Sequence, residues 1–237
     1  MMDNNRTNPD PSDLELEPVR TRMTVADNVH ASLRQALILG KFDPGQLLTI
    51  SALAKRFQTS QMPVRETLRR LAAEGALEMR SNGSAYVPQV TREALDDICQ
   101  ARVSVERLAT KLAVERSTEA EIDALARLED EHAAISGTKD IYDMLEKNRN
   151  FHFAIYRAAR SPVLLHVIST LWLRYGPFMR MLSLHLAPRL EDGLHEPFLD
   201  GHHAIVEAIR GKQAENAADL MQKDIERTQT LLQQLCD

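Results

Sequence analysis

Apolar residues recur at every fourth position in the first strongly patterned stretch of the chain, which comprises Val25, Val29, Leu33 and Leu37. This spacing places the apolar side chains on one face of an α-helix. Thr24 precedes the pattern and Asp27 follows three residues later, as in a capping box at a helix start. Gly40 comes after the last apolar residue and is typical of a helix end. The pattern therefore predicts a helix that begins near Thr24 and ends before Gly40.

Two shorter helices and a hairpin are expected next. The apolar spacing predicts helices over about 51–57 and 62–74, with Pro63 in the first turn of the second, where no backbone N–H is required. Short strands are predicted over 76–80 and 84–88, because the Asn-Gly pair between them is the strongest short-range hairpin signal. The order helix, helix, short turn, helix and hairpin is that of a winged helix-turn-helix.

The chain from residue 91 onward has a helical apolar pattern throughout. We expect six helices joined by short turns, near 91–116, 118–135, 139–159, 162–186, 190–210 and 212–235. Gly176-Pro177 predicts a kink in the fourth of them, and six such helices indicate an antiparallel bundle. The expected fold is mainly α, with a disordered N-terminal tail at 1–22, a winged helix-turn-helix domain at 23–90 and an all-α bundle at 91–237.

The composition is that of a globular protein. Of 237 residues, 43% are hydrophobic and 27% are charged, which excludes a wholly disordered or fibrous chain. No apolar run approaches the roughly 18 residues of a membrane helix, and no apolar signal region precedes residue 20. Cys99 and Cys236 provide no disulfide framework. We therefore expect a cytoplasmic protein with no membrane partner.

The formal net charge of −5 would argue against a nucleic-acid partner if it were evenly spread. Residues 1–19 carry a net charge of −4, residues 20–90 carry +5 and residues 91–237 carry −6. The basic block coincides with the predicted winged domain, and the acidic block coincides with the predicted bundle. This asymmetry indicates separate tasks for the two parts.

The basic block supplies side chains suited to DNA. The third helix of this motif enters the major groove, where Arg can pair with guanine and Gln with adenine. Residues of the second helix and of the wing are expected near the sugar-phosphate backbone or the minor groove. The predicted DNA-binding residues are Lys55, Arg56, Ser60, Gln61, Met62, Arg65, Arg69, Arg80, Asn82 and Gly83. The alternative is that the arginines only solvate an exposed helix face.

Polar residues interrupt the apolar faces of four bundle helices at matching places. They are Arg102 on the first helix, Asn148 and His152 one turn apart on the third, His202 on the fifth and Asp224 on the sixth. Because unpaired buried polar groups are costly, this pattern predicts a shared polar site. Two imidazoles, a carboxylate and an amide oxygen would suit a divalent ion such as zinc, nickel or manganese. The alternative is that these groups only hydrogen-bond one another.

Two further histidines are not assigned to this site. Glu129 and His132 have the spacing used in di-metal carboxylate bundles, but no second copy is present. We interpret the acidic run around them as a solvent-facing helix surface. His203 lies about 100° round the helix from His202 and is not expected to share its ligands.

The N-terminal segment resembles the GntR family of bacterial transcription regulators. The resemblance rests on residues 37–45, LILGKFDPG, and more specifically on residues 59–71, TSQMPVRETLRRL. It implies a homodimer on a near-palindromic, double-stranded operator. The family usually has Arg at the position of Gln61, so the operator base read at that point is expected to differ.

The C-terminal segment resembles the FCD ligand-binding domain of the FadR subgroup. The resemblance rests on Arg102 with Glu106, on the segment Asn150-Phe151-His152, and on His202 with Ile205 and Ala208. In metal-binding members the ligands are an Asp four residues before the Phe-His histidine, that histidine and two later histidines. The matching positions here are Asn148, His152, His202 and Asp224, of which two are retained and two are changed. The resemblance therefore implies either a divalent metal with an altered ligand set or a metal-free polar pocket.

The same resemblance implies a small organic acid as effector, bound beside the metal. Arg102 is the first candidate for its carboxylate, because Arg pairs well with carboxylates and this one lies on a core face. Arg174 and Tyr175 are further candidates. The expected function is an effector-controlled DNA-binding regulator, most often a repressor in this family. The alternatives are a metal-dependent helical enzyme with an appended winged domain, and a winged domain that contacts only proteins.

Overall fold

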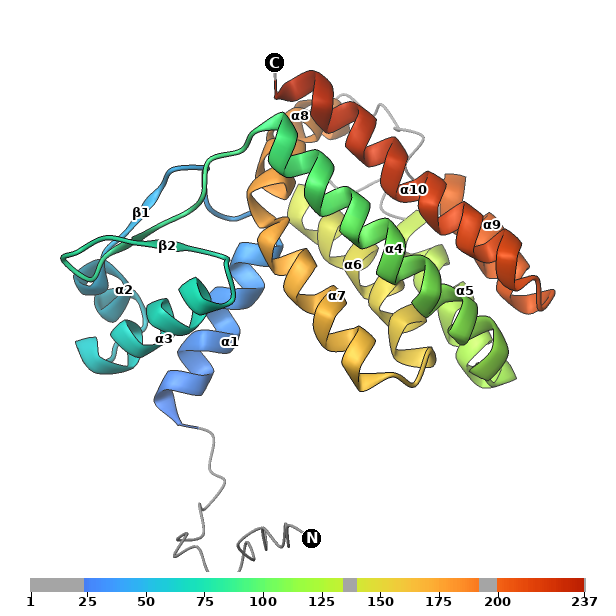
Figure 1. The fold of residues 1–237 in the computed structure, drawn as a ribbon, viewed down its shortest axis with the longest axis horizontal. Coiled ribbons are helices and arrows are strands. Elements are labelled where there is room, and N and C mark those ends of the chain that lie inside the picture. Colours follow the sequence, from blue (N-terminus) through green and yellow to red (C-terminus); the bar gives the residue numbers. More distant parts are fainter. Residues whose placement is uncertain (1–23, 134–139, 192–199, 237) are drawn as a thin grey trace, which may run out of the picture.

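The computed structural model describes residues 24–133, 140–191 and 200–236 (Figure 1). The predicted N-terminal tail and residues 192–199 of the expected helix over 190–210 lie outside the described residues. The chain forms a smaller N-terminal part beside a larger helical bundle, and helix α1 lies between the two (Figure 1). This arrangement is the mainly α fold that the apolar pattern predicts.

The N-terminal part is a winged helix-turn-helix. Its elements are α1 (Val25–Ile38), β1 (Leu47–Leu48), α2 (Ile50–Arg56), α3 (Gln61–Ala73), β2 (Glu78–Met79) and β3 (Ala85–Tyr86). The predicted capping box forms, since the Thr24 side chain accepts from the Asp27 amide and Asp27 accepts from the Thr24 amide. The strands form an antiparallel sheet in the order β1-β3-β2. The apolar pattern did not predict β1, because two residues are too few to show a strand period.

The larger part consists of helices packed around α4. Its described helices are α4 (Arg92–Arg116), α5 (Glu119–Ala133), α6 (Ile141–Ala158), α7 (Pro162–Arg174), α8 (Gly176–Glu191), α9 (Asp200–Arg210) and α10 (Ala214–Leu235). Helix α4 packs against α6, α7 and α10, while α5 packs against α6 and α9. Side chains at the centre of α4 therefore face several other helices at once.

The prediction of a single kinked helix over 162–186 is wrong. The chain forms two helices here, with Tyr175 as the C-cap of α7 and Gly176 as the first residue of α8. Pro177 explains the break, because proline has no N–H to donate and its ring obstructs a helix interior, whereas the first turn of a new helix accepts it. The described bundle consequently has seven helices rather than six.

The two parts meet where α1 ends and α8 begins, and glycine makes this approach close. A Cβ on Gly176 would lie 2.1 Å from the Leu37 carbonyl oxygen. A Cβ on Gly40, whose φ of +64° already favours glycine, would lie 2.4 Å from the Arg180 amide nitrogen. The Arg180 guanidinium also donates to Asp43 over 2.6 Å. The backbone contact and the ion pair fix α1 against the bundle.

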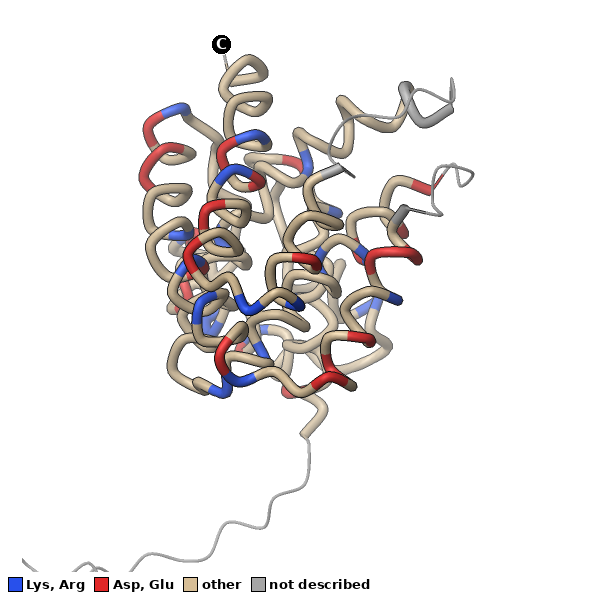
Figure 2. The backbone as a smooth tube through the Cα atoms, turned by 90° about the vertical axis from the view of Figure 1, so that its right-hand side faces the viewer, with Lys and Arg blue, Asp and Glu red and all other residues tan. Residues whose placement is uncertain are grey.

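Both signs of charge occur along the bundle helices (Figure 2). The acidic excess of the bundle therefore does not form one continuous block on the side that this view shows. Among the described residues, no helix combines the length and the apolar character needed to cross a lipid bilayer.

Candidate DNA-binding surface and buried polar site

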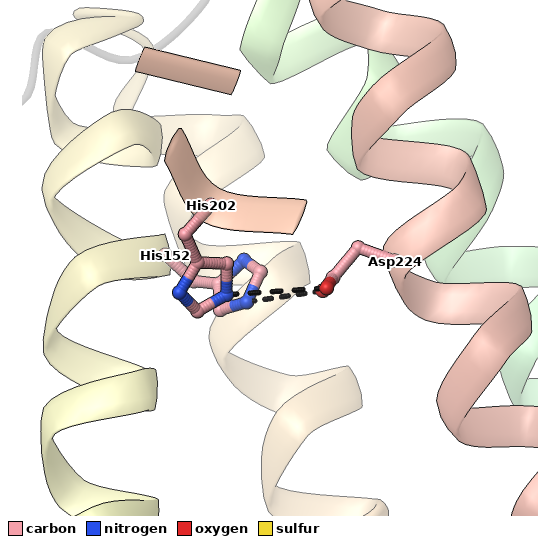
Figure 3. A group of neighbouring side chains, drawn as sticks. All are labelled: His152, His202 and Asp224. Carbon is pink, nitrogen blue, oxygen red and sulfur yellow. Dashed lines mark ion pairs between the residues drawn. The ribbon is translucent and has the colours of Figure 1, made fainter. Parts of the chain in front are cut away.

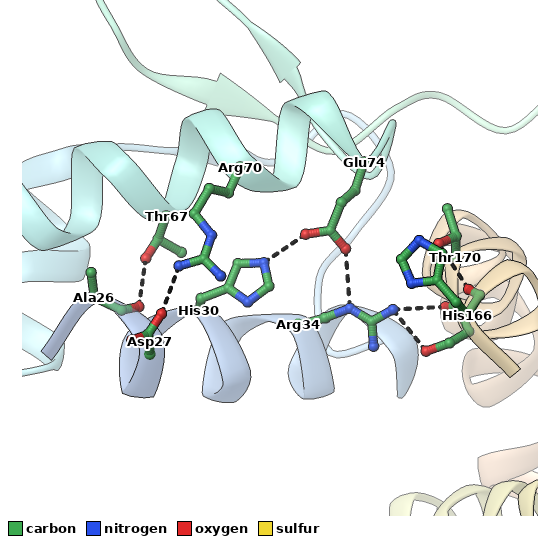
Figure 4. Close-up of polar contacts among 10 residues, drawn as sticks. Ala26, Asp27, His30, Arg34, Thr67, Arg70, Glu74, His166 and Thr170 are labelled. Atoms are coloured by element: carbon green, nitrogen blue, oxygen red, sulfur yellow. Dashed lines mark hydrogen bonds and ion pairs between the residues drawn. The ribbon is translucent and has the colours of Figure 1, made fainter. Parts of the chain in front are cut away.

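Helix α3 is held in place by polar contacts with α1 (Figure 4). Arg70 donates to Asp27 over 2.9 Å, and the Thr67 hydroxyl donates to the Ala26 carbonyl over 3.2 Å. The hydrogen bonds from Arg70 and Thr24 lower the pKa of Asp27 to about 2. Arg70 therefore contacts α1 through its ion pair with Asp27, and the face of α3 that points away from α1 is left for other contacts.

A second set of contacts joins the end of α3 to α1 and then to the bundle. The Glu74 carboxylate accepts from His30 Nε2 over 2.7 Å and from Arg34 Nε over 3.1 Å (Figure 4). Arg34 also donates to the backbone carbonyl of Ser169 on α7 over 2.9 Å. The orientation of α3 is therefore linked to the bundle through α1.

The predicted DNA-binding residues lie mainly on the open side of the winged domain. Met62 is 71% exposed at the start of α3, although it is a large apolar residue. Arg65 is half-buried because its guanidinium lies next to the wing. The remaining predicted side chains are exposed, namely Lys55, Arg56, Ser60, Gln61, Arg69, Arg80 and Asn82.

The wing and α3 meet at Gly83. A Cβ on this residue, whose φ is +82°, would lie 2.9 Å from Nη1 of Arg65. Asn82 shapes the same turn, because its side-chain oxygen accepts from the Ser84 amide over 3.0 Å. Gly83 therefore allows the Arg65 guanidinium to approach the wing, and the two predicted elements form one continuous surface.

Three of the predicted polar residues in the bundle come together (Figure 3). His152 on α6 is 2% exposed, His202 on α9 is fully buried and Asp224 on α10 is 9% exposed. His152 Nε2 lies 3.3 Å from Asp224 Oδ2, and His202 Nε2 lies 3.9 Å from Asp224 Oδ1. One ligand atom from each residue lies within 4.8 Å of the others. Asn148 lies one turn before His152 and is half-buried.

His132 is buried in this site, so its interpretation as a solvent-facing residue is wrong. Its side chain is 3% exposed, and its ring centroid lies 4.9 Å from that of His202. The acidic residues Asp130 and Glu131 led to the error, since they are exposed while His132 packs against His202 on α9. A signal was present: Ile122 and Leu125 are buried on the same helix, and His132 continues their spacing. His203, in contrast, is exposed and lies outside the group formed by His152, His202 and Asp224.

Three side chains of the site, His132, His202 and Asp224, have pKa values well below their ordinary ranges. Burial, followed by the influence of His152, lowers the pKa of His132 to about 4 and that of His202 to about 3. Burial raises the pKa of Asp224, but the hydrogen bond and charge of His152 outweigh it and lower the value to about 2. Within the described part of the chain, neither ring nitrogen of His202 has a hydrogen-bond partner. Orphaned imidazole nitrogens beside a carboxylate fit a borderline divalent metal ion.

Arg102 lies in an adjacent buried network. Its Nε donates to Glu106 over 2.7 Å, and its guanidinium is 4.7 and 4.5 Å from the ring centroids of Trp172 and Tyr175. The fully buried Glu106 carboxylate also accepts from Trp172 over 3.0 Å and from Tyr156. This carboxylate is therefore fully paired, whereas a guanidinium has five N–H donors and Glu106 occupies two of them.

Tyr156 connects the two groups, because its hydroxyl donates to Glu106 and lies 3.3 Å from His152 Nδ1. Tyr175 is buried beside Arg102, and its hydroxyl has no hydrogen-bond partner in the described chain. Arg174 lies elsewhere, exposed in a groove between the winged domain and the bundle that also includes Gly75. The structure thus brings together Arg102 and Tyr175 but not Arg174.

Both parts of the chain match known protein families. Residues 25–87 match the bacterial regulatory proteins of the gntR family, and residues 97–227 match the FCD domain. The chain belongs to the GntR family. Its members are DNA-binding transcriptional regulators, so a metal-dependent enzyme is excluded as the function of this chain.

Individual relatives agree with this assignment. The HTH-type transcriptional regulator McbR of Escherichia coli is 31% identical over 201 residues, which cover 83% of this chain and 89% of that protein. The HTH-type transcriptional repressor GlaR of the same organism is 26% identical, over 85% of this chain and 93% of that protein. The solved structure of E. coli McbR/YncC superposes with a TM-score of 0.82 at 26% identity, covering 91% of this chain and all of that one.

Proposed function

We propose that this regulator is a homodimeric repressor whose operator affinity is controlled by a small organic acid bound inside the bundle, beside a divalent metal. The name of GlaR, a repressor, supports the sign of regulation. The observation that carries the effector part is Arg102, a buried guanidinium that retains unused N–H donors beside the unpaired Tyr175 hydroxyl.

The winged domain would contact the operator through the open face of α3 and the wing. Arg65 and Gln61 have the side-chain chemistry for base edges in the major groove. Lys55 and Arg56 on α2, with Arg80 on the wing, are exposed cations suited to phosphates. The proximity of Arg65 to Gly83 supports a combined reading surface in which the wing positions this arginine.

The buried polar site would hold the metal and the acid together. His152, His202 and Asp224 would bind the ion, with Asn148 as the remaining position of the family pattern. The bound metal would supply a Lewis acid that accepts a carboxylate oxygen. Arg102 would donate to the second carboxylate oxygen, while Trp172 and Tyr175 hold its guanidinium between their rings.

The test requires an operator, which selection from a random duplex library supplies. Fluorescence anisotropy then measures operator affinity with and without a panel of small mono- and dicarboxylates, in buffer containing zinc. We expect an active acid to change the affinity by about 5- to 150-fold, which is the usual range of coupling between sites.

The decisive variant replaces the buried ion pair as a unit, Arg102→Met with Glu106→Leu, so that neither charge is left unpaired. It should bind the operator without acid and lose the response to acid. Arg174→Met is the matched control and should keep the response. If the response to acid survives in the double variant and disappears in Arg174→Met, the effector site lies instead in the groove between the winged domain and the bundle.

A further inference from the structure

His132 is a buried imidazole that the family pattern does not assign to the metal site. The four family positions are 148, 152, 202 and 224, and in this chain they offer only two imidazoles. His132 comes from α5, a helix that supplies none of these four positions. Its ring is nevertheless buried, and its centroid lies 4.9 Å from the ring of His202.

The chemistry of the family positions leaves the ligand set short of a strong donor. Zinc and nickel are bound well by imidazole nitrogen and carboxylate oxygen, whereas a neutral amide oxygen is a weak ligand for them. Asn148 would be the fourth ligand if the family positions alone were used. A third imidazole would give a set of three nitrogens and one carboxylate oxygen, a combination well suited to zinc.

We propose that His132 is a ligand of the bundle metal, replacing the imidazole that the family pattern loses at Asp224. This inference rests on the proposed metal site and names its donors as His132, His152, His202 and Asp224. His152 and His202 are edge to face with centroids 5.0 Å apart, so the His202 ring has two imidazole neighbours, His132 and His152. The group of ligand atoms within 4.8 Å of one another comprises His152, His202 and Asp224, so binding through His132 requires its ring, which already lies beside that of His202, to turn a nitrogen toward the group.

A purely structural role for His132 makes a different prediction. His202 is stacked on Phe151 with centroids 4.2 Å apart, and His132 covers another side of the same ring. If His132 only packs against His202, a flat apolar ring of similar size should replace it without effect on the metal. The two unpartnered nitrogens of His202 are equally consistent with a metal in both cases, so the test must report on His132 itself.

The experiment measures zinc affinity of the full-length protein after removal of metal by EDTA, using competition with a chromophoric chelator. His132→Phe retains a flat ring and removes the nitrogens. His203→Phe is the matched control, because His203 directly follows the site residue His202 in the chain but its side chain is exposed. Asn148→Ala tests the competing fourth ligand. Far-UV circular dichroism and operator binding without metal verify that each variant is folded.

We expect wild type and His203→Phe to bind zinc equally, Asn148→Ala to bind almost as well, and His132→Phe to bind at least about tenfold more weakly. Removal of a residue that only hydrogen-bonds a metal ligand typically lowers metal affinity 10- to 100-fold, so removal of a direct ligand should lower it at least as much. The visible spectrum of the cobalt-substituted protein should change in His132→Phe only. In wild type, side-chain ¹⁵N NMR should show a zinc-induced shift of a His132 ring nitrogen, which requires no variant.

Equal zinc affinity and an unchanged cobalt spectrum in His132→Phe, with no ¹⁵N shift in wild type, would overturn the assignment of His132 and leave the proposed metal site intact. Absence of zinc, nickel and manganese binding in wild type would overturn both the metal site and this inference. The acid response of the operator complex, measured separately, would then decide the remainder of the proposed function.

Discussion

Burial of several imidazoles in one place has a cost that depends on pH. His132, His152 and His202 lie around one carboxylate, Asp224, and at most a single positive charge is compensated there. Burial therefore keeps His132 and His202 neutral at pH 7, with their pKa values at about 4 and about 3. The same neutrality leaves their lone pairs free for a metal.

The metal-free protein should lose stability as the pH falls below about 6.5. The unfolded chain then takes up protons on His132 and His202, with an ordinary pKa near 6.5, while the folded chain does not until its lowered pKa values are reached. Each histidine should lower the free energy of unfolding by about 1.4 kcal/mol per pH unit in this window, or about 3 kcal/mol for both. Above pH 6.5 this contribution is constant.

Urea unfolding of EDTA-treated protein at pH 7.5, 6.5, 5.5 and 5.0 measures the effect. His132→Phe should retain about half of the slope, because only His202 then remains. Asp224 does not mask the result, since its pKa of about 2 keeps it ionised throughout this range. A free energy of unfolding that stays constant between pH 6.5 and 5.0 would contradict the prediction.

At the scale of elements, what the sequence could predict depended on the length of the periodic signal. Helices α1, α3 and α4 begin and end within about two residues of the predicted bounds, because each shows several turns of apolar spacing and a cap. Strand β1 was missed since its pairing with β3 is non-local. The α7–α8 boundary was misjudged because Gly-Pro permits both a kink and a break, and the chain has the break, with Pro177 in the first turn of α8.

Gly176 lies where α8 approaches α1, so a substitution there tests how closely the two helices must pack. Ala at this position would place a Cβ 2.1 Å from the Leu37 carbonyl oxygen and force α1 away from α8. We expect Gly176→Ala to lower the free energy of unfolding by about 1–3 kcal/mol, as overpacking usually does. Chemical denaturation measures the change.

Gly211→Ala is the control for this substitution. Its nearest neighbour would be the flexible end of Gln213 at 3.2 Å, and its backbone does not require a positive φ. It should be much less destabilising than Gly176→Ala. Equal stability of wild type and Gly176→Ala would mean that α1 and α8 can separate at little cost.

At the scale of the whole molecule, the candidate site and the winged domain share the start of α8. Tyr175 lies 4.5 Å from the Arg102 guanidinium, measured to the ring centroid, and the next residue, Gly176, touches α1. Arg34, three residues before Leu37 on α1, connects this helix to Glu74 at the end of α3 and to Ser169 on α7. The apolar faces of the helices could predict which polar residues are buried in the bundle. The contacts of α1 with α7 and α8, however, join segments more than a hundred residues apart and have no local signal in the sequence. His132 differs, because the spacing of Ile122 and Leu125 on its own helix did indicate a buried position.

The separation of charge between the two parts gives a prediction for the regulator on DNA. Basic residues of the winged domain should release counterions from the phosphates, so the logarithm of operator affinity should fall steeply and linearly with the logarithm of salt concentration. Lys55→Ala should reduce the slope by about one for each bound subunit and weaken all sequences alike. Arg65→Ala should instead relax base preference at one operator position in each half-site.

Arg127→Ala removes the same charge from an exposed site on α5 and should leave the slope unchanged. If Arg127→Ala and Lys55→Ala lower the slope equally, the overall charge of the molecule, and not the exposed face of the winged domain, determines how this regulator binds DNA.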